Sequence, residues 1–478
     1  MTKEDAQYEK MTQGNTKKLV LSLGTATMIS MLITAIYNIA DTFFVSDISK
    51  NATAAVTVVF PLMAIIQAVG FTLGMGAGSL VSSALGEKRN EDAQIIGSSA
   101  FYGSVILGTI ITVLCYIFMN PLMKLLGSTD DILPYARDYS LWIIAGFPLM
   151  AGSFVMNNLL RSEGKAKFAM IGLTTGGILN MILDPVLISG CSLGISGAAI
   201  ATVISQAVSF TILLMMFLLK KSIIKLSIKE TSHKIKVYGE IVKVGFPSLC
   251  RQGLASIATI LLNNAAKNYG NESTIAAIGV TNKVVMIIFS MCLGIGQGYQ
   301  PVCGYNYFAK KYDRVKEAMI FTFIFSFVAM TLVSLVCFIF AKQIITVFAN
   351  SHEDTTELIE IGKKALRFQC ISMPILSLNV IVNMTYQSTK RSVIASILSC
   401  CRQGLFFIPF VLILPLIFKL NGVILTQPIS DICTSLFSVP FFIATLKDLN
   451  KKNKETMDKL YIENKKAYGQ ACYIERTC

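Results

Sequence analysis

Apolar residues in this chain occur in long runs that are separated by short polar breaks. The run from 318 to 341 covers 24 positions without a charged side chain, and about 20 apolar residues cross the hydrocarbon core of a bilayer as a helix. The regions 101–119 and 195–219 have the same character. The pattern therefore predicts an all-α polytopic membrane protein.

Twelve such runs divide the chain, and we expect each to form one transmembrane helix. The composition agrees, because 53% of the residues are hydrophobic and 15% are charged, whereas soluble proteins have about 25% charged residues. The expected helices cover residues 18–46, 51–84, 94–120, 133–160, 168–189, 195–220, 241–267, 275–305, 317–341, 359–386, 393–418 and 423–446.

Basic residues gather in every second break, for example in 86–93, 161–167 and 220–236. Loops rich in Lys and Arg stay in the cytoplasm, so both termini are expected there. The formal net charge of +14 then anchors the cytoplasmic face against the lipid bilayer. Because the cations flank the spans and form no separate domain, we expect no nucleic-acid partner.

Two stretches of the first half recur in the second half. Gly74, Gly76 and Gly78 correspond to Gly294, Gly296 and Gly298, and we expect these glycines to allow close helix packing. Residues 146–167 resemble residues 372–393, and Asn157 corresponds to Asn383. The repeat predicts two six-helix bundles related by a pseudo-two-fold axis along the membrane normal, because an even number of spans preserves orientation.

The repeat and the charge pattern together give the domain organisation. We expect an N-lobe at 18–220, a basic cytoplasmic linker at 221–240 and a C-lobe at 241–446. Residues 1–17 and 447–478 are expected to be cytoplasmic tails.

Asp41 lies inside the first apolar run without a basic neighbour in the sequence. Thr34, Tyr37 and Asn38 precede it by seven, four and three positions, so all four share one helix face. An ionised carboxylate costs several kcal/mol in hydrocarbon. This polar stripe should therefore face the protein interior.

The fifth run repeats this arrangement with Asp184, which follows Asn180 by one turn and precedes Pro185. Asn157 and Thr202 could complete an N-lobe pocket around it. Burial favours the neutral form of a carboxylate, and two neighbouring acids share protons or bind a small cation such as Na⁺. The alternatives are a structural acid at Asp41 and helix capping at Asp184.

The C-lobe contains charged residues of less specific meaning. Arg251 and Arg402 are expected to orient helices or neutralise an acid, and Lys283 and Asp431 are weaker candidates. Met286, Met291 and Tyr299 either line a cavity or serve ordinary packing.

Several classes of function lack their motifs. The sequence has no Walker A motif and only 2 histidines, and its 12 cysteines are scattered through apolar segments without metal-site spacing. We therefore expect no cofactor, no enzymatic activity and no ATP-driven transport. An ion gradient is the expected driving force.

Several motifs in this order resemble the multidrug and toxic compound extrusion (MATE) family. They are "YNIADTFFV", "GEKRNEDA", the N-x-x-x-D-P of the fifth run and "GIGQGYQPVCGYNYFAKKYDRVKEA". "LRSEGKAKFAM" and "LFFIPFVLILP" are similar to the MepA-like bacterial branch. The resemblance covers about residues 15–446.

This resemblance implies the V-shaped MATE fold with a central cavity, in the cytoplasmic membrane of a bacterium. It implies an antiporter, expected as a monomer, that exports cationic lipophilic compounds in exchange for H⁺ or Na⁺. The helix 1 acid of the family corresponds to Asp41, and its helix 5 pair to Asn180 and Asp184. Tyr37, Asn157 and Thr202 match positions around that site.

One departure from the family concerns the seventh and tenth runs, which lack the acids of the NorM-like branch. Ion coupling is therefore expected through the N-lobe, with H⁺ and Na⁺ both open. The alternative carrier is a lipid-linked saccharide flippase of the same superfamily, which would present several cations in its cavity. An intramembrane enzyme would need a nucleophile and base that the spans do not supply.

Overall fold

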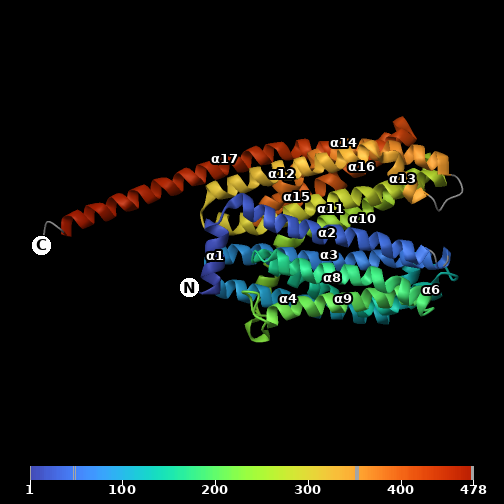
Figure 1. The fold of residues 1–478 in the computed structure, drawn as a ribbon, viewed down its shortest axis with the longest axis horizontal. Helices are drawn as coiled ribbons and strands as arrows, with labels where there is room; N and C mark the ends of the chain where they lie inside the picture. Colours follow the sequence, from blue (N-terminus) through green and yellow to red (C-terminus); the bar gives the residue numbers. More distant parts are fainter. Residues whose placement is uncertain (1, 47, 49, 350–354, 475–478) are drawn as a thin grey trace.

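The protein is a bundle of long, roughly parallel helices (Figure 1). This computed structural model describes residues 2–46, 48, 50–349 and 355–474. The first half comprises α1 (Lys3–Gln13), α2 (Thr16–Ser46), α3 (Lys50–Gly86), α4 (Asn90–Ile117), α5 (Met119–Leu125), α6 (Leu133–Ala145), α7 (Phe147–Ser162), α8 (Ala166–Pro185), η1 (Val186–Gly190) and α9 (Gly194–Leu218). The second comprises η2 (Ile228–Glu230), α10 (Ile235–Tyr269), α11 (Glu272–Phe308), α12 (Tyr312–Ile339), α13 (Ala341–Ala349), α14 (Thr355–Ser388), α15 (Ser392–Cys400), η3 (Cys401–Phe406), α16 (Phe407–Phe418) and α17 (Leu420–Ile474).

The predicted apolar runs all coincide with a helix or with a broken helix. Within the described residues, 10 helices are long and apolar enough to cross a membrane, and the pair α6–α7, bent by 46°, raises the number to 11. The run predicted at 241–267 forms α10, whose 35 residues are long enough to span but include Lys243, Arg251 and Lys267. The chain is thus a multi-pass membrane protein, and the count of twelve spans stays a prediction.

The two halves repeat each other down to single hydrogen bonds. Asn157 Nδ2 donates to the carbonyl oxygen of Ala169 at 2.9 Å, which joins α7 to α8. At positions 226 residues further along, Asn383 Nδ2 donates to the carbonyl oxygen of Ala395 at 2.6 Å, which joins α14 to α15. The internal repeat inferred from the sequence is therefore present in the fold.

The halves meet along two helix pairs near the end of the bundle that holds both termini, which we call the termini side. There α2 packs along α11, and α3 packs along α10. A Cβ on Gly245 of α10 would lie 2.7 Å from the carbonyl carbon of Thr72 and nearer still to its oxygen. A Cβ on Gly298 would lie 2.5 Å from Cα of Gly24. These glycines allow backbone to touch backbone, so the termini side is closed.

A buried arginine adds a polar contact to this seam. Arg161, at the end of α7, donates through Nη1 to Gln297 of α11 and through Nη2 to Asn158 Oδ1 at 2.6 Å. No described carboxylate forms an ion pair with Arg161. The sequence suggested no role for it, because a cation at a helix end usually snorkels to the membrane surface.

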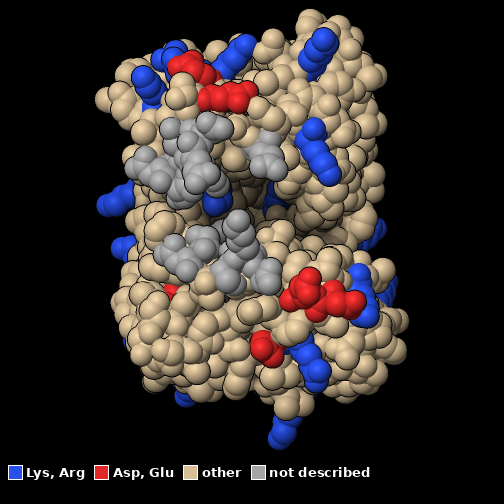
Figure 2. All heavy atoms as spheres, turned by 90° about the vertical axis from the view of Figure 1, so that its right-hand side faces the viewer, with Lys and Arg blue, Asp and Glu red and all other residues tan. Residues whose placement is uncertain are grey.

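The opposite end of the bundle is open. Figure 2, which views this end, shows a hollow between the upper half of the picture, the C-lobe, and the lower half, the N-lobe. Lys or Arg side chains are visible inside the hollow. With the seam closed at one end and the hollow open at the other, the two halves have the V-shaped arrangement that the family resemblance implies.

The first helix, α1, lies across the termini-side ends of both halves (Figure 1). On the N-lobe, Gln7 Nε2 donates to the carbonyl oxygen of Glu163 at 2.7 Å. On the C-lobe, three side chains donate to carbonyl oxygens at the end of α1: Asn306 Nδ2 to Met11 at 3.0 Å, Lys311 Nζ to Thr12 at 3.0 Å, and Arg314 to Gly14. The C-terminal end of a helix attracts cations, so α1 is bound to both halves.

Glu163 fastens the linker to the N-lobe. Its fully buried carboxylate accepts hydrogen bonds from the Ser222 hydroxyl and from the backbone N–H groups of Ile223 and Ile224 at 2.8 and 3.1 Å. Burial raises the pKa of Glu163 above its ordinary value of 4.5, although Lys165 and these donors oppose the shift. The basic linker is thus tied to the end of α7.

The segments expected as tails both contain helix. Besides α1, the last helix α17 continues past the predicted end at 446 to Ile474, and Figure 1 shows it extending beyond the bundle. Asp448 of α17 accepts a hydrogen bond from Arg391 at 2.5 Å and lies 3.2 Å from Lys452 Nζ. These contacts attach the start of the extension to the C-lobe.

Candidate functional site

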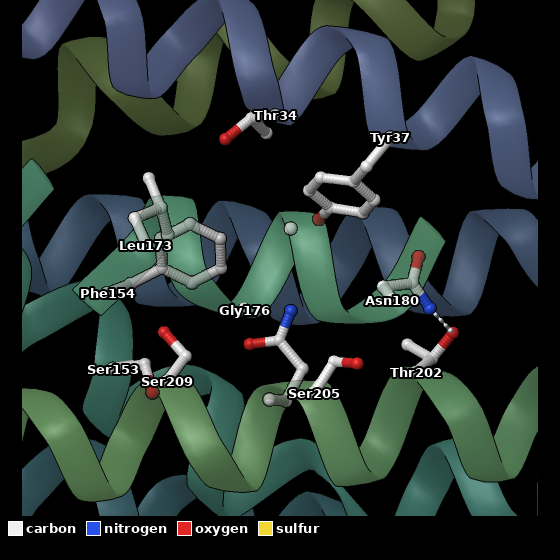
Figure 3. Close-up of a pocket in the computed structure, with 12 residues that line it drawn as sticks. Thr34, Tyr37, Ser153, Phe154, Leu173, Gly176, Asn180, Thr202, Ser205 and Ser209 are labelled. Atoms are coloured by element: carbon white, nitrogen blue, oxygen red, sulfur yellow. Dashed lines mark hydrogen bonds between the residues drawn. The ribbon is translucent and has the colours of Figure 1, made fainter. Parts of the chain in front are cut away.

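A pocket lies inside the N-lobe between α2, α7, α8 and α9 (Figure 3). Together with its mouth it contains about 460 Å³ of empty space. Its wall is formed by Thr34, Tyr37, Ser153, Phe154, Leu173, Gly176, Gly177, Asn180, Thr202, Ser205, Gln206 and Ser209. Four of the residues predicted from the sequence, Thr34, Tyr37, Asn180 and Thr202, thus line one pocket.

Glycines on α8 bring the polar stripe of α2 to this pocket. A Cβ on Gly177 would lie 3.1 Å from Cδ1 of Tyr37, so a larger residue there would push the tyrosine away. Figure 3 shows the Tyr37 ring pointing from α2 toward α8. The inward orientation predicted for this stripe is therefore confirmed at Tyr37.

Acceptor oxygens without donors gather beside the pocket. Asn180 Nδ2 donates to Asp184 Oδ1 at 3.1 Å and to Thr202 Oγ1 at 3.4 Å, the second bond being drawn in Figure 3. Three buried oxygens have no hydrogen-bond partner among the described residues: Asp41 Oδ1, Asn180 Oδ1 and Asp184 Oδ2. Such atoms are rare in folded proteins and usually indicate a bound water, ion or proton.

Asp41 and Asp184 lie near enough for their charges to act on each other. Tyr139 of α6 is fully buried close to both acids, and its hydroxyl lies 3.9 Å from Met63 Sδ. Sequence reasoning missed Tyr139, because one tyrosine among many apolar residues of a span gives no signal. The two acids and Asn180 therefore come together as predicted, with an additional phenol beside them.

The helix that bears Asp184 changes its geometry just after the acid. The α-helix ends at Pro185, and the π-helical turn Val186–Gly190 follows directly. Proline cannot donate a backbone hydrogen bond, and π-helical turns often occur at functional sites. The α-helical geometry is therefore broken one residue after Asp184.

Two predicted supporting residues lie elsewhere. Asn157 does not line the pocket, since its amide joins α7 to α8 through Ala169 as Asn383 does in the other half. The matching bond gives Asn157 the same place in the N-lobe that Asn383 has in the C-lobe. Asn38 is not part of the pocket wall either, and its amide donates to the carbonyl oxygen of Thr34 at 2.7 Å.

The three C-lobe residues considered as cavity lining, Tyr299, Met291 and Met286, differ in their burial. Tyr299 is fully buried and its hydroxyl lies 3.0 Å from Thr385 Oγ1, so it packs within the C-lobe and does not line a cavity. Met291 is half-buried. Met286 is 39% exposed on α11.

The C-lobe contains a buried polar cluster around Asp431, a residue that was only a weak candidate on sequence grounds. Arg402 Nε donates to Asp431 Oδ1 at 2.9 Å, and Gln427 and Gln369 donate to the same carboxylate at 2.7 Å each. Arg402 thus neutralises an acid, as expected. The polar chemistry is not confined to the N-lobe, but the C-lobe acid is fully paired, whereas the N-lobe acids are not.

The N-lobe arrangement suits reversible binding of a small cation or a proton. No group of three or more His, Cys, Asp or Glu side chains that could hold a metal ion occurs among the described residues. Two carboxylates and one amide oxygen are, however, ligands that Na⁺ accepts, and an acid without donors also accepts a proton.

The chain is similar to known proteins both in sequence and in fold. The MatE family model matches residues 26–186 and again residues 247–413, one match in each half. The multidrug export protein MepA of Staphylococcus haemolyticus (strain JCSC1435) is 25% identical over 460 residues, which are 95% of this chain and 98% of that protein. MepA of Staphylococcus aureus (strain N315) is 26% identical over 421 residues, covering 87% and 90% of the two chains.

Solved structures show the same fold. The crystal structure of MATE in complex with MaL6 has a TM-score of 0.88 at 24% identity and covers 95% of this chain and 100% of its own. The outward-facing structure of a multidrug resistance MATE family transporter of the MOP superfamily also has a TM-score of 0.88 at 24% identity, with coverage of 95% and 99%. Because the family model matches most of the chain, this protein belongs to the MatE family.

Proposed function

We propose that this protein is a cation-coupled multidrug antiporter that exports cationic lipophilic compounds across a bacterial cytoplasmic membrane. Relatives named multidrug export proteins, similar over nearly the whole chain, support the substrate class. They give no support to the flippase alternative. The absence of a nucleotide-binding motif in the sequence supports an ion gradient as the energy source.

The N-lobe acids are the proposed coupling site. The observation that carries the proposal is the group of buried oxygens without donors at Asp41, Asn180 and Asp184. An ionised carboxylate in such surroundings is costly, so H⁺ or Na⁺ binding stabilises the site. A ligand moves a conformational equilibrium only if it binds one state better than the other. Ion binding near the break after Pro185 supplies such a difference.

The direction of the cycle follows from the charge of the loops. The positive-inside rule places the termini side in the cytoplasm, so the hollow of this structure opens to the outside. An ion or proton that enters through the hollow binds Asp41 and Asp184 and weakens the attraction for a cationic substrate. Substrate leaves outward, and the neutralised carrier returns toward the cytoplasm.

Ethidium efflux from cells that express the protein tests the coupling site. Asp41→Asn should abolish efflux without changing the amount of protein in the membrane. The control is Asp138→Asn on α6, an exposed acid that does not line the pocket, which should leave efflux unchanged. Normal efflux by Asp41→Asn would exclude Asp41 from the mechanism. Proteoliposomes with a pH gradient or a Na⁺ gradient, applied separately, would identify the coupling ion.

A further inference from the structure

The fold brings two copies of one tetrapeptide side by side in the C-lobe. CRQG occurs at 250–253 in α10 and again at 401–404 in η3, and α10 packs against both α15 and η3. A Cβ on Gly404 would lie 3.0 Å from Cδ1 of Leu254, so the backbone of η3 comes close to the side chains of α10. Two segments that are far apart in the C-lobe sequence are therefore in direct contact.

Two thiols lie beside each other one turn before this contact. Cys250 precedes Leu254 by four residues, and Cys400 precedes Gly404 by four residues. Residues four apart share a helix face, so both cysteines lie on the faces along which α10 and α15 meet. The thiols of Cys250 and Cys400 are within hydrogen-bonding reach of each other, and both are free and half-buried.

The next cysteine along the chain does not share this position. Cys401 is fully buried, and successive residues of a helix point about 100° apart around its axis. Cys400 and Cys401 therefore lie on different faces, and the fold selects Cys400 as the neighbour of Cys250. This difference provides a matched control.

The pair joins two parts of the C-lobe that serve different purposes. On α10, Gly245 precedes Cys250 by five residues and touches the backbone of Thr72 in the seam between the halves. On the other side, Cys400 ends α15 directly before the π-helical turn η3, which contains Arg402. A covalent bond between the thiols would thus tie the seam helix to the start of a break in its neighbour.

We infer that Cys250 and Cys400 form a dithiol site that organic hydroperoxides oxidise to a disulfide, which restrains α10 against η3. Thiols in contact need little backbone movement to form this bond. Cys400 lies in the candidate membrane span 392–418, where apolar hydroperoxides such as oxidised lipids dissolve. The disulfide site does not depend on the proposed function, whereas its effect on transport rests on it.

The reaction removes two electrons from the two thiols. One thiol, as the thiolate, attacks the hydroperoxide, the O–O bond breaks, and a sulfenic acid and an alkoxide form; the alkoxide takes up the proton and leaves as an alcohol. The second sulfur then attacks the sulfenic sulfur, the S–S bond forms, and the hydroxyl group leaves with the second proton as water. The sum is two thiols and one hydroperoxide giving one disulfide, one alcohol and one water.

Peptide mapping of the full chain in lipid nanodiscs tests the site. The protein is treated with cumene hydroperoxide, free thiols are blocked with N-ethylmaleimide, and trypsin is added without a reductant. Trypsin cleaves after Lys and Arg and releases Cys250 in the peptide 244–251. Cys400 and Cys401 share the peptide 392–402. Mass spectrometry should find these two peptides linked in treated protein, and dithiothreitol should separate them.

Three variants identify the reacting thiols. Cys250→Ser and Cys400→Ser should each reduce the amount of linked peptide at least about tenfold, because one of the two sulfur atoms is missing. Cys401→Ser is the matched control and should link as wild-type protein does. Absence of the linked peptide from treated wild-type protein would overturn the inference, and so would loss of the link in Cys401→Ser with its retention in Cys400→Ser.

Ethidium efflux from proteoliposomes tests the restraint on α10. Efflux by the linked protein should slow at least about twofold, because a disulfide fixes the spacing of the two helices, and dithiothreitol should restore it. Cys250→Ser should not respond to the hydroperoxide. Unchanged efflux by fully linked protein would overturn the restraint. Wild-type protein that forms the link but exports no ethidium when reduced would contradict the proposed function and leave the disulfide site intact.

Discussion

The glycine contact between α3 and α10 offers a way to shift the conformational equilibrium without touching either polar site. In Gly245→Ala, the new methyl group would lie 2.7 Å from the carbonyl carbon of Thr72, whereas ordinary van der Waals contact begins at 3.4 Å. The obstacle is backbone of the opposite half and cannot rotate away. The substitution therefore destabilises the closed seam of the termini side.

The size of this effect follows from the cost of overpacking, about 1–3 kcal/mol. If that cost falls only on the state with the closed seam, the ratio of the two states changes by about 5- to 150-fold. Gly253→Ala is the matched control on the same helix, because no atom lies within 4 Å of its added methyl group. Both substitutions raise helix propensity equally, by about 1 kcal/mol.

Distances between spin labels across the hollow provide the measurement. Leu125 on α5 and Val347 on α13 are 83% and 72% exposed and follow the far ends of α4 and α12. Labels at these positions, in a background without the native cysteines, should come closer in Gly245→Ala because the hollow closes as the seam opens. Gly253→Ala should match the parent protein. The steric reasoning is refuted if Gly245→Ala leaves the distance distribution unchanged, or if Gly253→Ala shifts it equally.

Three further predictions concern stability, measured by thermal unfolding in detergent. Asn157→Ala and Asn383→Ala should each cost about 1 kcal/mol, because each removes a buried hydrogen bond between two helices; a much smaller cost at Asn157 than at Asn383 would argue against a matched structural role. Arg402→Gln should lower the free energy of unfolding by about 3–5 kcal/mol, because it leaves Asp431 as an unpaired buried charge. Adding Asp431→Asn should restore most of the lost stability. A double variant that stays as unstable as Arg402→Gln would contradict the importance of the ion pair. Folding raises the pKa of Glu163, so the folded protein binds the carboxyl proton more tightly than the unfolded chain does. The free energy of unfolding should therefore fall as the pH rises from 4.5 through the raised pKa. Glu163→Gln should remove this contribution to the pH dependence of stability, and an unchanged pH dependence would show that Glu163 does not titrate in this range.

The sequence predicted most of the helices and part of the candidate site for identifiable physical reasons. Apolar runs must be helical in a bilayer, because each backbone polar group needs a partner within the segment. A polar stripe such as that of Tyr37 cannot face lipid, so its inward orientation could be inferred. The spacing of Asn180 and Asp184 on one helix, one turn apart, likewise fixed their common face.

Contacts between segments distant in the sequence could not be predicted. Asn157 and Thr202 are both polar residues of spans, and only the packing of α7 on α8 shows that Asn157 bonds Ala169 instead of the pocket. The contact of Arg161 with Gln297 joins residues 136 positions apart. The helix α1, by contrast, had a readable signal, because Thr2 and Asp5 form a capping box.

The helix α1 has a consequence for the transport cycle. At the termini side, α1 donates a hydrogen bond to the N-lobe and accepts hydrogen bonds from the C-lobe. It cannot keep both sets of bonds when the two halves separate on that side. Its end is held to the C-lobe by Asn306, Lys311 and Arg314, although the chain continues from it directly into α2 of the N-lobe. We therefore expect α1 to oppose opening of the termini side, and substitutions in α1 should change how fast the carrier turns over without changing what it carries.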